Sequence, residues 1–303
     1  MKYRKAVATA PTSLDEVRIE EAEHAALTQG EIRVKMQYAP IRPSDLNMLA
    51  GNYGETPAGN FTPGGEGSGV VMETLHDDFK EGDTVIPLTR LSKGTWSEIW
   101  QGAGEQFYRT EKTSTIEAAA LRINPLSALL MLESWDATSN TSVLINAANS
   151  KVGHYMWQIA HHRQIPVVGT VRSEEARNEV LGCYPWLITT QVLLDTKESE
   201  HQLEQWGAEK PFSLALNAVG GESSLRQLRY LAEGGTQITY GAVSGKPSRL
   251  LASHLIFKDL CLKGFWLNQW SKQQDTETIQ RKLRYLEGLS LKFDKADRYF
   301  SFH

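Results

Sequence analysis

Cysteine is almost absent from this sequence. Cys183 and Cys261 are its only two cysteines in 303 residues, so a disulfide framework and a metal site built from several thiolates are both excluded. Disulfides persist in oxidising compartments, and their exclusion favours a reducing one. We therefore expect a cytoplasmic location, and we expect both cysteines to act as small buried hydrophobic residues.

The sequence also lacks long hydrophobic runs and an excess of one charge. No stretch approaches the roughly 20 apolar residues that span a bilayer, and residues 1–7 begin a strand-like alternation with no signal-peptide core. The 32 basic and 36 acidic residues leave a formal charge of -4. Because this charge is small and no basic run stands out, we expect neither a nucleic-acid partner nor a membrane partner.

The character of the sequence changes near residue 123. Up to about residue 122, short strands alternate with turns rich in glycine and proline, which predicts a mainly antiparallel β region. The clearest of these strands are 31–36, 69–73 and 83–87. After residue 123, strands alternate with helix-length amphipathic segments, a pattern typical of parallel βαβ units. Six strands are predicted there: 142–147, 166–171, 192–194, 214–218, 237–240 and 260–265. The predicted fold class is therefore α/β, with a doubly wound parallel sheet.

The first βα turn of the second region, residues 146–153, indicates a dinucleotide site. In Rossmann folds the free N–H groups at the start of the following helix hold the pyrophosphate. Only Gly153 remains of the usual three glycines, so an ordinary turn in which Gly153 merely permits close packing is the alternative.

The end of the second strand favours NADP(H) over NAD(H). Arg172 stands there instead of the acidic residue that binds the ribose hydroxyls of NAD. A guanidinium can pair bidentately with a 2′-phosphate. The alternative for Arg172 is a solvated cation at a strand end.

Several short strings between residues 39 and 270 carry a family resemblance. They are 39–47 (APIRPSDLN), 51–54 (GNYG), 64–67 (GGEG), 123–125 (INP), 216–221 (LNAVGG), 239–241 (TYG), 256–260 (IFKDL) and 264–267 (GFWL). Together they resemble the zinc-free branch of the medium-chain dehydrogenase/reductase superfamily, and most closely the mitochondrial-type enoyl thioester reductases. The resemblance implies a GroES-like catalytic domain of residues 1–122 and 268–303, with a shortened C-terminal part, and a Rossmann domain of residues 123–267.

Zinc alcohol dehydrogenases of this superfamily bind their metal through a cysteine and a Gly-His-Glu string. Here Ser44 stands at the cysteine position and Gly65 at the histidine position. The resemblance therefore implies no catalytic metal.

The activity that the resemblance implies is NADPH-dependent reduction of the 2,3 double bond of a trans-2-enoyl thioester, carried by CoA or ACP. The hydride goes to the β carbon, the thioester oxygen needs hydrogen-bond donors, and the α carbon needs a proton. Tyr53 is implied as the proton donor, because a phenol with a pKa near 10 stays protonated at neutral pH. Trp266 is implied as a second catalytic residue that contacts the substrate carbonyl. The alternatives are a loop tyrosine anchored on the core and a tryptophan buried at the domain junction.

The same matching implies which residues bind NADPH. They are Asn124, Asn149, Ser150, Lys151, Val152, Gly153, Arg172, Ser173, Tyr240, Gly241, Ala242, Val243, Phe265, Trp266 and Leu267. Lys151 replaces a glycine of the family loop, so we expect strain there if the position requires a positive φ. The chain also ends before the family's final helix and strand, which include a lysine near the cofactor. A homodimer formed through the nucleotide domain is implied as well.

Two alternative functions stay open. An NADPH:quinone oxidoreductase of the same branch would reduce a quinone and would need no tyrosine acid, although Asn52-Tyr53 and Phe265-Trp266 favour the thioester. A binding or regulatory protein would keep the fold and the NADPH site without turnover. Lys151 and the short C-terminus motivate that second alternative.

Overall fold

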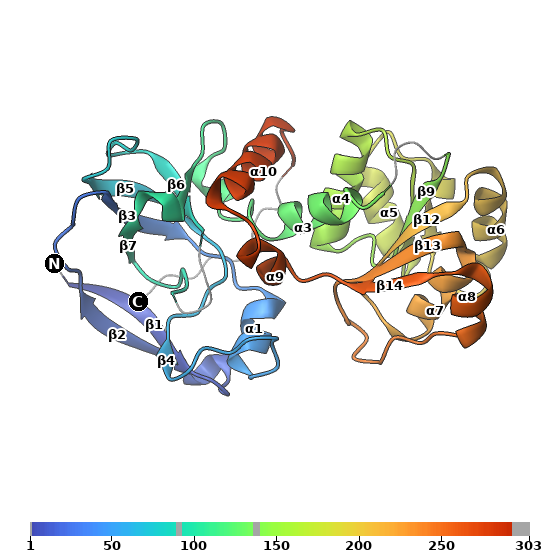
Figure 1. Cartoon of the computed structure of the whole chain (residues 1–303), viewed down its shortest axis with the longest axis horizontal. Coiled ribbons are helices and arrows are strands. Elements are labelled where there is room, and N and C mark those ends of the chain that lie inside the picture. The colour runs from blue at the N-terminus through green and yellow to red at the C-terminus, as the bar shows by residue number, and fades with distance from the viewer. Residues whose placement is uncertain (1, 89–92, 136–139, 293–303) are drawn as a thin grey trace. The chain divides into compact units, whose positions relative to one another are not determined.

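The computed structural model describes residues 2–88, 93–135 and 140–292. The chain forms two compact units, one of Met1–Leu126 with Asn268–His303 and one of Ser127–Leu267. The sequence placed the corresponding boundaries after residues 122 and 267. Within each unit the strands and helices follow the α/β class that the sequence predicts (Figure 1).

The first unit contains two antiparallel sheets. The smaller has the order β2 (Arg18–Glu23), β1 (Lys2–Thr9), β4 (Asn60–Phe61). The larger has the order β7 (Ile99–Ala103), β3 (Glu31–Tyr38), β5 (Ser68–Thr74), β6 (Thr84–Pro87), β8 (Phe107–Arg109). β3, β5 and β6 confirm the three strands predicted in this region. Their apolar side chains gather with Trp100 and Phe107 in one buried cluster, because alternate residues of a strand face the same side.

The second unit contains one parallel sheet of six strands. Its order is β11 (Val192–Leu194), β10 (Val167–Val171), β9 (Ser142–Ile145), β12 (Phe212–Asn217), β13 (Leu231–Thr239), β14 (Cys261–Gly264). In chain order this is 3-2-1-4-5-6, the doubly wound Rossmann arrangement. The predicted Rossmann sheet is therefore confirmed, and each of the six predicted strands corresponds to a strand of this sheet.

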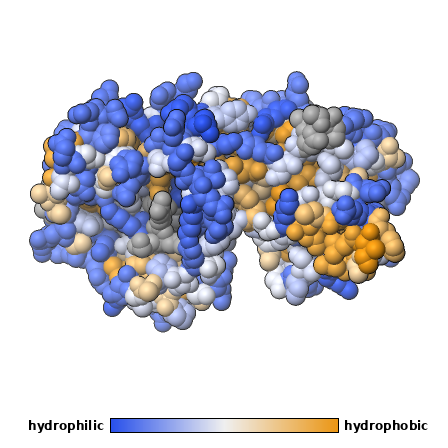
Figure 2. Space-filling model, viewed as in Figure 1, coloured by the Kyte–Doolittle hydropathy of each residue, from blue (hydrophilic) through white to orange (hydrophobic). Residues whose placement is uncertain are grey.

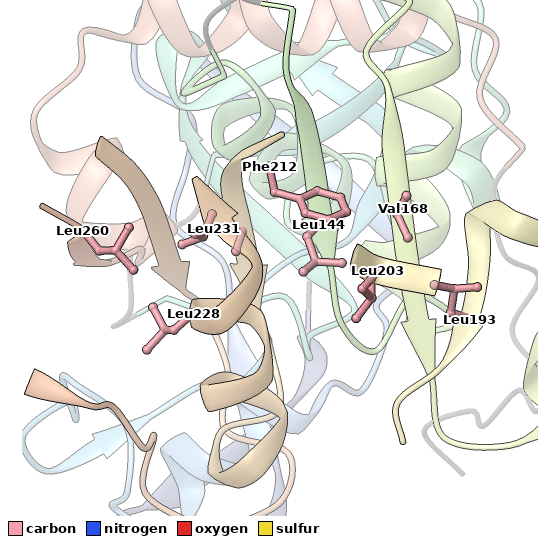
Figure 3. Close-up of a cluster of buried hydrophobic side chains, with 9 residues drawn as sticks. Leu144, Val168, Leu193, Leu203, Phe212, Leu228, Leu231 and Leu260 are labelled. Atoms are coloured by element: carbon pink, nitrogen blue, oxygen red, sulfur yellow. The ribbon is translucent and has the colours of Figure 1, made fainter. Parts of the chain in front are cut away.

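Helices cover both faces of this sheet (Figure 1). One face carries α4 (Lys151–His162) and α5 (Glu174–Cys183), and the other carries α6 (Glu200–Glu209), α7 (Gly221–Tyr230) and α8 (Ala252–Lys258). Figure 3 shows the core that results: leucines and a phenylalanine from the strands meet Leu203 of α6 and Leu228 of α7. Every residue of β9 and β10 is buried, as expected for strands that are covered on both faces.

Most of the remaining helices belong to the first unit. They are α1 (Pro43–Leu49), α2 (Thr115–Ala118), α3 (Asn124–Leu132), α9 (Leu267–Lys272), α10 (Thr276–Gly288) and the 3-10 turns Leu14–Glu16, Gly104–Gln106 and Thr189–Gln191. Among the described residues, no helix combines the length and the apolar composition that crossing a membrane requires. The shortened C-terminal part that the family resemblance implies includes residues 293–303, which lie outside the described ranges.

The expected burial of the two cysteines is wrong, because both are exposed. Cys183 is the last residue of α5, and Cys261 lies on β14, whose residues are all exposed. Neither position faces the core, so hydrophobic packing does not explain either cysteine.

A buried carboxylate holds α10 onto the first unit. Oε1 of Glu287 accepts the backbone N–H groups of Glu111, Lys112 and Thr113 at 2.9 to 3.0 Å, and Oε2 accepts the hydroxyl of Tyr108 at 2.8 Å. Burial raises the pKa of Glu287, but the hydrogen bonds from Lys112, Tyr108 and Thr113 together outweigh it and leave the pKa below its usual value. The ionised form is therefore the one that the folded protein stabilises.

We expect Glu287→Gln to lower the free energy of unfolding by about 2 kcal/mol near neutral pH, because hydrogen bonds to a charged group are lost. A carboxyl whose pKa is lowered by folding stabilises the protein above its unfolded pKa of about 4.3 and loses this effect as the pH falls through the folded pKa. Urea unfolding should therefore show a difference between wild type and variant that shrinks below about pH 4. Glu277→Gln changes an exposed residue of the same helix and is the control. If Glu287→Gln lowers the free energy of unfolding equally near neutral pH and below about pH 4, the role of the charge is contradicted.

Candidate active site

The turn after β9 presents the amino end of α4. Ser150 caps this helix, and its Oγ accepts the N–H of Gly153 at 3.1 Å. The first N–H groups of a helix have no partner within it, and their partial positive charge favours an anion. The sequence predicted a phosphate-binding turn here, and the local structure has the features that such a turn requires.

Gly153 lets α4 approach the sheet closely. A Cβ at this position would lie 2.5 Å from the carbonyl oxygen of Ala148. Trp157 donates from Nε1 to the same carbonyl at 3.1 Å. The packing role offered as the alternative for Gly153 is therefore present, and it determines how near the turn can come to a ligand.

The strain expected at Lys151 is absent. Lys151 is the first residue of α4, and the left-handed backbone of the turn falls on Ala147 instead, with φ at 47°. A non-glycine residue in this conformation costs of order 1–3 kcal/mol. Lys151 is exposed, so its ammonium group adds positive charge near the amino end of the helix.

Arg172 is a cation that follows β10. Arg172 is exposed, and its side chain forms no ion pair or hydrogen bond with any residue of the described ranges. Ser173 caps α5, and its Oγ accepts the N–H of Ala176 at 3.3 Å. The nearest acid along the chain, Glu174, pairs with Arg177 at 3.4 Å. The guanidinium of Arg172 is thus available for an external anion.

Tyr240 follows β13 and carries a buried hydroxyl that has no hydrogen-bond partner among the described residues. Burial raises the pKa of this phenol, and the nearby Ser150 opposes the rise. A buried polar group left unpaired costs about 1–3 kcal/mol, and a polar ligand group beside Ser150 would remove that cost.

Two buried asparagines, to which the sequence interpretation gave no role of their own, join β9 to β12. Asn146 donates to Oδ1 of Asn217 at 2.9 Å and accepts the N–H of Ala218 at 2.7 Å. Asn217 also accepts the N–H of Gly220 at 3.1 Å and donates to Thr239 at 3.1 Å. Both side chains are fully buried. A polar residue at the carboxyl end of two neighbouring apolar strands is the signal that could have revealed them.

The other predicted cofactor residues of the second unit follow β13 and β14. Gly241 packs against Ala218, and Val243 donates its N–H to the carbonyl of Ala218 at 2.9 Å. Phe265 donates its N–H to Thr239 at 2.9 Å. Of the remaining residues, Ala242 is exposed, Val152 and Trp266 are half-buried, Leu267 is buried, and Asn149 is half-buried in the α4 turn. Carboxyl ends of parallel strands are where ligands bind in open α/β sheets.

Tyr53 and Asn124 belong to the first unit. Tyr53 lies in the turn after α1, half-buried against a cluster that includes Met48, Phe61 and Trp96. Tyr53 therefore does pack on the core, as the alternative of a loop tyrosine anchored on the core requires. Asn124 begins α3 and is half-buried.

Family models match both units of the chain. The alcohol dehydrogenase GroES-like domain matches residues 28–110, and the zinc-binding dehydrogenase family matches residues 152–283. Similar curated proteins are mitochondrial enoyl-[acyl-carrier-protein] reductases. The one from Bos taurus is 36% identical over 269 residues, which covers 87% of this chain and 72% of that protein. The one from Arabidopsis thaliana is 35% identical over 270 residues, 86% of this chain and 71% of that protein.

Solved structures of enoyl thioester reductases also resemble this chain. The Etr1p/NADP/crotonyl-CoA complex matches with a TM-score of 0.86 and 26% identity, covering 98% of this chain and 91% of that chain. The mitochondrial 2-enoyl thioester reductase heterodimer Etr1p/Etr2p of Candida tropicalis has the same TM-score, identity and coverage. A Bacillus thuringiensis structure named for NADPH:quinone reductase activity has a TM-score of 0.82 at 22% identity, covering 98% of this chain and 91% of that chain, and shows a shared fold alone.

The zinc in the family description does not fit the residues of this chain. Within 2–88, 93–135 and 140–292, no group of three or more His, Cys, Asp or Glu could hold a metal ion. Beside the expected positions Ser44 and Gly65, Asp45 accepts the N–H of Gly65 at 2.9 Å, and Glu66 forms an ion pair with Arg42. The carboxylates of this loop are therefore engaged by protein donors.

Identity above 30% across more than two thirds of the curated relatives establishes the family. It confirms the predicted resemblance and the oxidoreductase class. The names of those relatives place them in mitochondria, so the cytoplasmic location stays a prediction. The chain belongs to the enoyl thioester reductase family of the medium-chain dehydrogenase/reductase superfamily.

Proposed function

We propose that the protein reduces the 2,3 double bond of a trans-2-enoyl thioester with NADPH. The observation that carries this proposal is the likeness to enoyl reductases across both units, with Tyr53 retained in its Asn-Tyr-Gly turn. Crotonyl-CoA, which accompanies NADP in one similar structure, represents the substrate class. The acyl chain would be carried by CoA or ACP.

The second unit would hold NADPH, which when bound supplies a hydride for the β carbon. Asn149, Ser150, Lys151 and Val152 would hold the pyrophosphate at the amino end of α4, and Gly153 would let the helix come close. Arg172 and Ser173 would hold the 2′-phosphate. Asn124 would also contact the cofactor. The residues proposed for the nicotinamide half are Tyr240, Gly241, Ala242, Val243, Phe265, Trp266 and Leu267.

Tyr53 would complete the reaction as the general acid. After the hydride reaches the β carbon, negative charge spreads to the α carbon and the thioester oxygen. The Tyr53 O–H bond breaks, a C–H bond forms at the α carbon, and the electron pair stays on the phenolate oxygen. Trp266 would contact the substrate carbonyl.

The two alternatives are less well supported. The quinone reductase likeness lies below 25% identity and concerns the fold alone. The binding protein was motivated in part by strain at Lys151, and the backbone there is helical. Both alternatives are outcomes of the experiments below.

A homodimer through the second unit is also proposed. β14 pairs with β13 on one side, and within the described ranges no strand pairs with its other edge. Figure 2 shows hydrophobic residues gathered over β14 and α8. They include Leu251, Ile256, Phe257 and Leu262, which are 40 to 79% exposed. A second copy can add its own β14 antiparallel to this edge about a two-fold axis and cover the patch.

The first prediction concerns Tyr53. We expect wild type to oxidise NADPH with crotonyl-CoA, and Tyr53→Phe to lower kcat at least about 100-fold by removing the acid, with the Kd for NADPH unchanged. NADPH absorbance and fluorescence measure the two quantities, and Tyr38→Phe is the control in the same unit. Reduction of benzoquinone but not of crotonyl-CoA would contradict the thioester as the substrate class. Full activity of Tyr53→Phe would contradict the role of Tyr53 as the proton donor.

The second concerns Arg172. Removing the guanidinium in Arg172→Ala should raise the Kd for NADPH at least about tenfold and leave the Kd for NADH nearly unchanged, because a charge-assisted bond is worth about 1.5–3 kcal/mol. Lys210→Ala, which removes an exposed cation just before the amino end of β12, is the control. A constant ratio of the two Kd values would refute the 2′-phosphate assignment.

The third concerns the dimer. Wild type should show twice the chain mass of 33.9 kDa by light scattering, and Leu262→Arg should shift the mass toward one chain, because a charge would be buried at the paired edge. Leu14→Arg changes an equally exposed leucine of the first unit and should leave the mass unchanged. A monomeric wild type would disprove this interface.

A further inference from the structure

The turn that carries Tyr53 is joined to a distant helix by an ion pair. Glu55 lies two residues after Tyr53, and its Oε1 accepts a hydrogen bond from Nζ of Lys272. Lys272 is the last residue of α9 and is 217 residues away in the sequence. Both residues belong to the first unit, so the contact is made within one compact unit of the chain.

The turn has little regular structure of its own. Residues 51–59 form no helix or strand. At the start of the turn, Asn52 donates its N–H to the carbonyl of Asn47 at 2.8 Å, and after its end strand pairing begins at Asn60. Segments without a ladder of backbone hydrogen bonds open most readily. Between its two ends, the turn is therefore held in part by the contact of Glu55.

Lys272 stands on a segment that is itself fixed to the larger sheet. α9 leads through residues 273–275 into α10. Gln280 of α10 donates from Nε2 to the carbonyl of Phe107 on β8 at 2.9 Å, and Glu287 accepts the N–H groups of the loop that follows β8. α10 is thus attached to the edge of the sheet, and the α9 end that precedes it can hold Glu55 in place.

We propose that Glu55 and Lys272 are positioning residues for the proton transfer, whose ion pair keeps the turn in the conformation that brings the Tyr53 hydroxyl within reach of the α carbon. This inference rests on the proposed function. A general acid has to lie close to the atom that it protonates, and small displacements of a reacting group lower the rate. The two side chains are 37% and 42% exposed, and pairs of this exposure contribute modestly. We therefore expect a loss of about two- to fivefold in kcat when the pair is broken.

Hydrogen exchange of the protein alone, without cofactor or substrate, tests whether the pair holds the turn. Glu55→Gln keeps the shape of the side chain and removes its charge. The amides of residues 52–59 should then exchange about two- to fivefold faster, as measured by mass spectrometry. Lys2→Met is the control, because it breaks another exposed ion pair of the first unit, with Glu21 at 3.1 Å, and should leave exchange in the turn unchanged. Unchanged exchange in Glu55→Gln overturns the proposal.

Kinetics with crotonyl-CoA then test the role in the reaction. Glu55→Gln and Lys272→Met should each lower kcat about two- to fivefold, with the Kd for NADPH unchanged. The double variant should lose no more than either single variant, because both remove the same interaction. Exchanging the two charges, in Glu55→Lys combined with Lys272→Glu, should recover most of kcat. Lys2→Met should keep the kcat of wild type.

Two kinetic results would overturn the positioning role. One is a pair of losses that add in the double variant, since two independent effects would then be at work. The other is an unchanged kcat in Glu55→Gln although the turn exchanges faster. If wild type does not turn over crotonyl-CoA, the proposed function fails, whereas the exchange measurement still decides whether Glu55 and Lys272 hold the turn.

Discussion

The hydrogen bond between Asn146 and Asn217 is the interaction on which the ligand edge of the second unit depends. It joins β9 and β12, the two central strands, at their carboxyl ends. Strand order reverses between these strands, and such a switch point is where open α/β sheets bind ligands. Asn146 precedes the turn into α4, and Asn217 fixes the turn that follows β12. Losing either amide would leave buried partners unsatisfied and would release both turns.

The fold could be predicted because its signals are local. Apolar strands separated by helix-length segments indicate a parallel sheet whatever their tertiary partners, and β9 to β14 follow that pattern. Helix α1 was not predicted, because it lies inside a turn-rich string where Pro43 and Asp45 mark its start only in retrospect. Exposure of Cys261 was missed for a related reason: an edge strand differs from a central one in its neighbours, which its own residues do not reveal.

The parts of the candidate site that depend on local backbone conformation could be predicted from the sequence. The parts that depend on contacts between residues far apart in the sequence could not. Ser150 and Gly153 act on the turn that contains them. Lys151 was expected to be strained because a glycine position was carried over from the family, whereas the helix begins at Lys151 and Ala147 takes the positive φ. Asn146, in contrast, donates to Asn217, which is far away in the sequence. Contacts of this kind follow from tertiary structure alone.

The central claim is hydride delivery from NADPH to the β carbon of an enoyl thioester, with protonation at the α carbon. Mass spectrometry and NMR of the butyryl-CoA formed from crotonyl-CoA test it directly. With NADPH deuterated at its transferable position, the account predicts one deuterium at the β carbon. With ordinary NADPH in deuterated water, it predicts one deuterium at the α carbon. Solvent deuterium at the β carbon, or no butyryl-CoA at all, would contradict it.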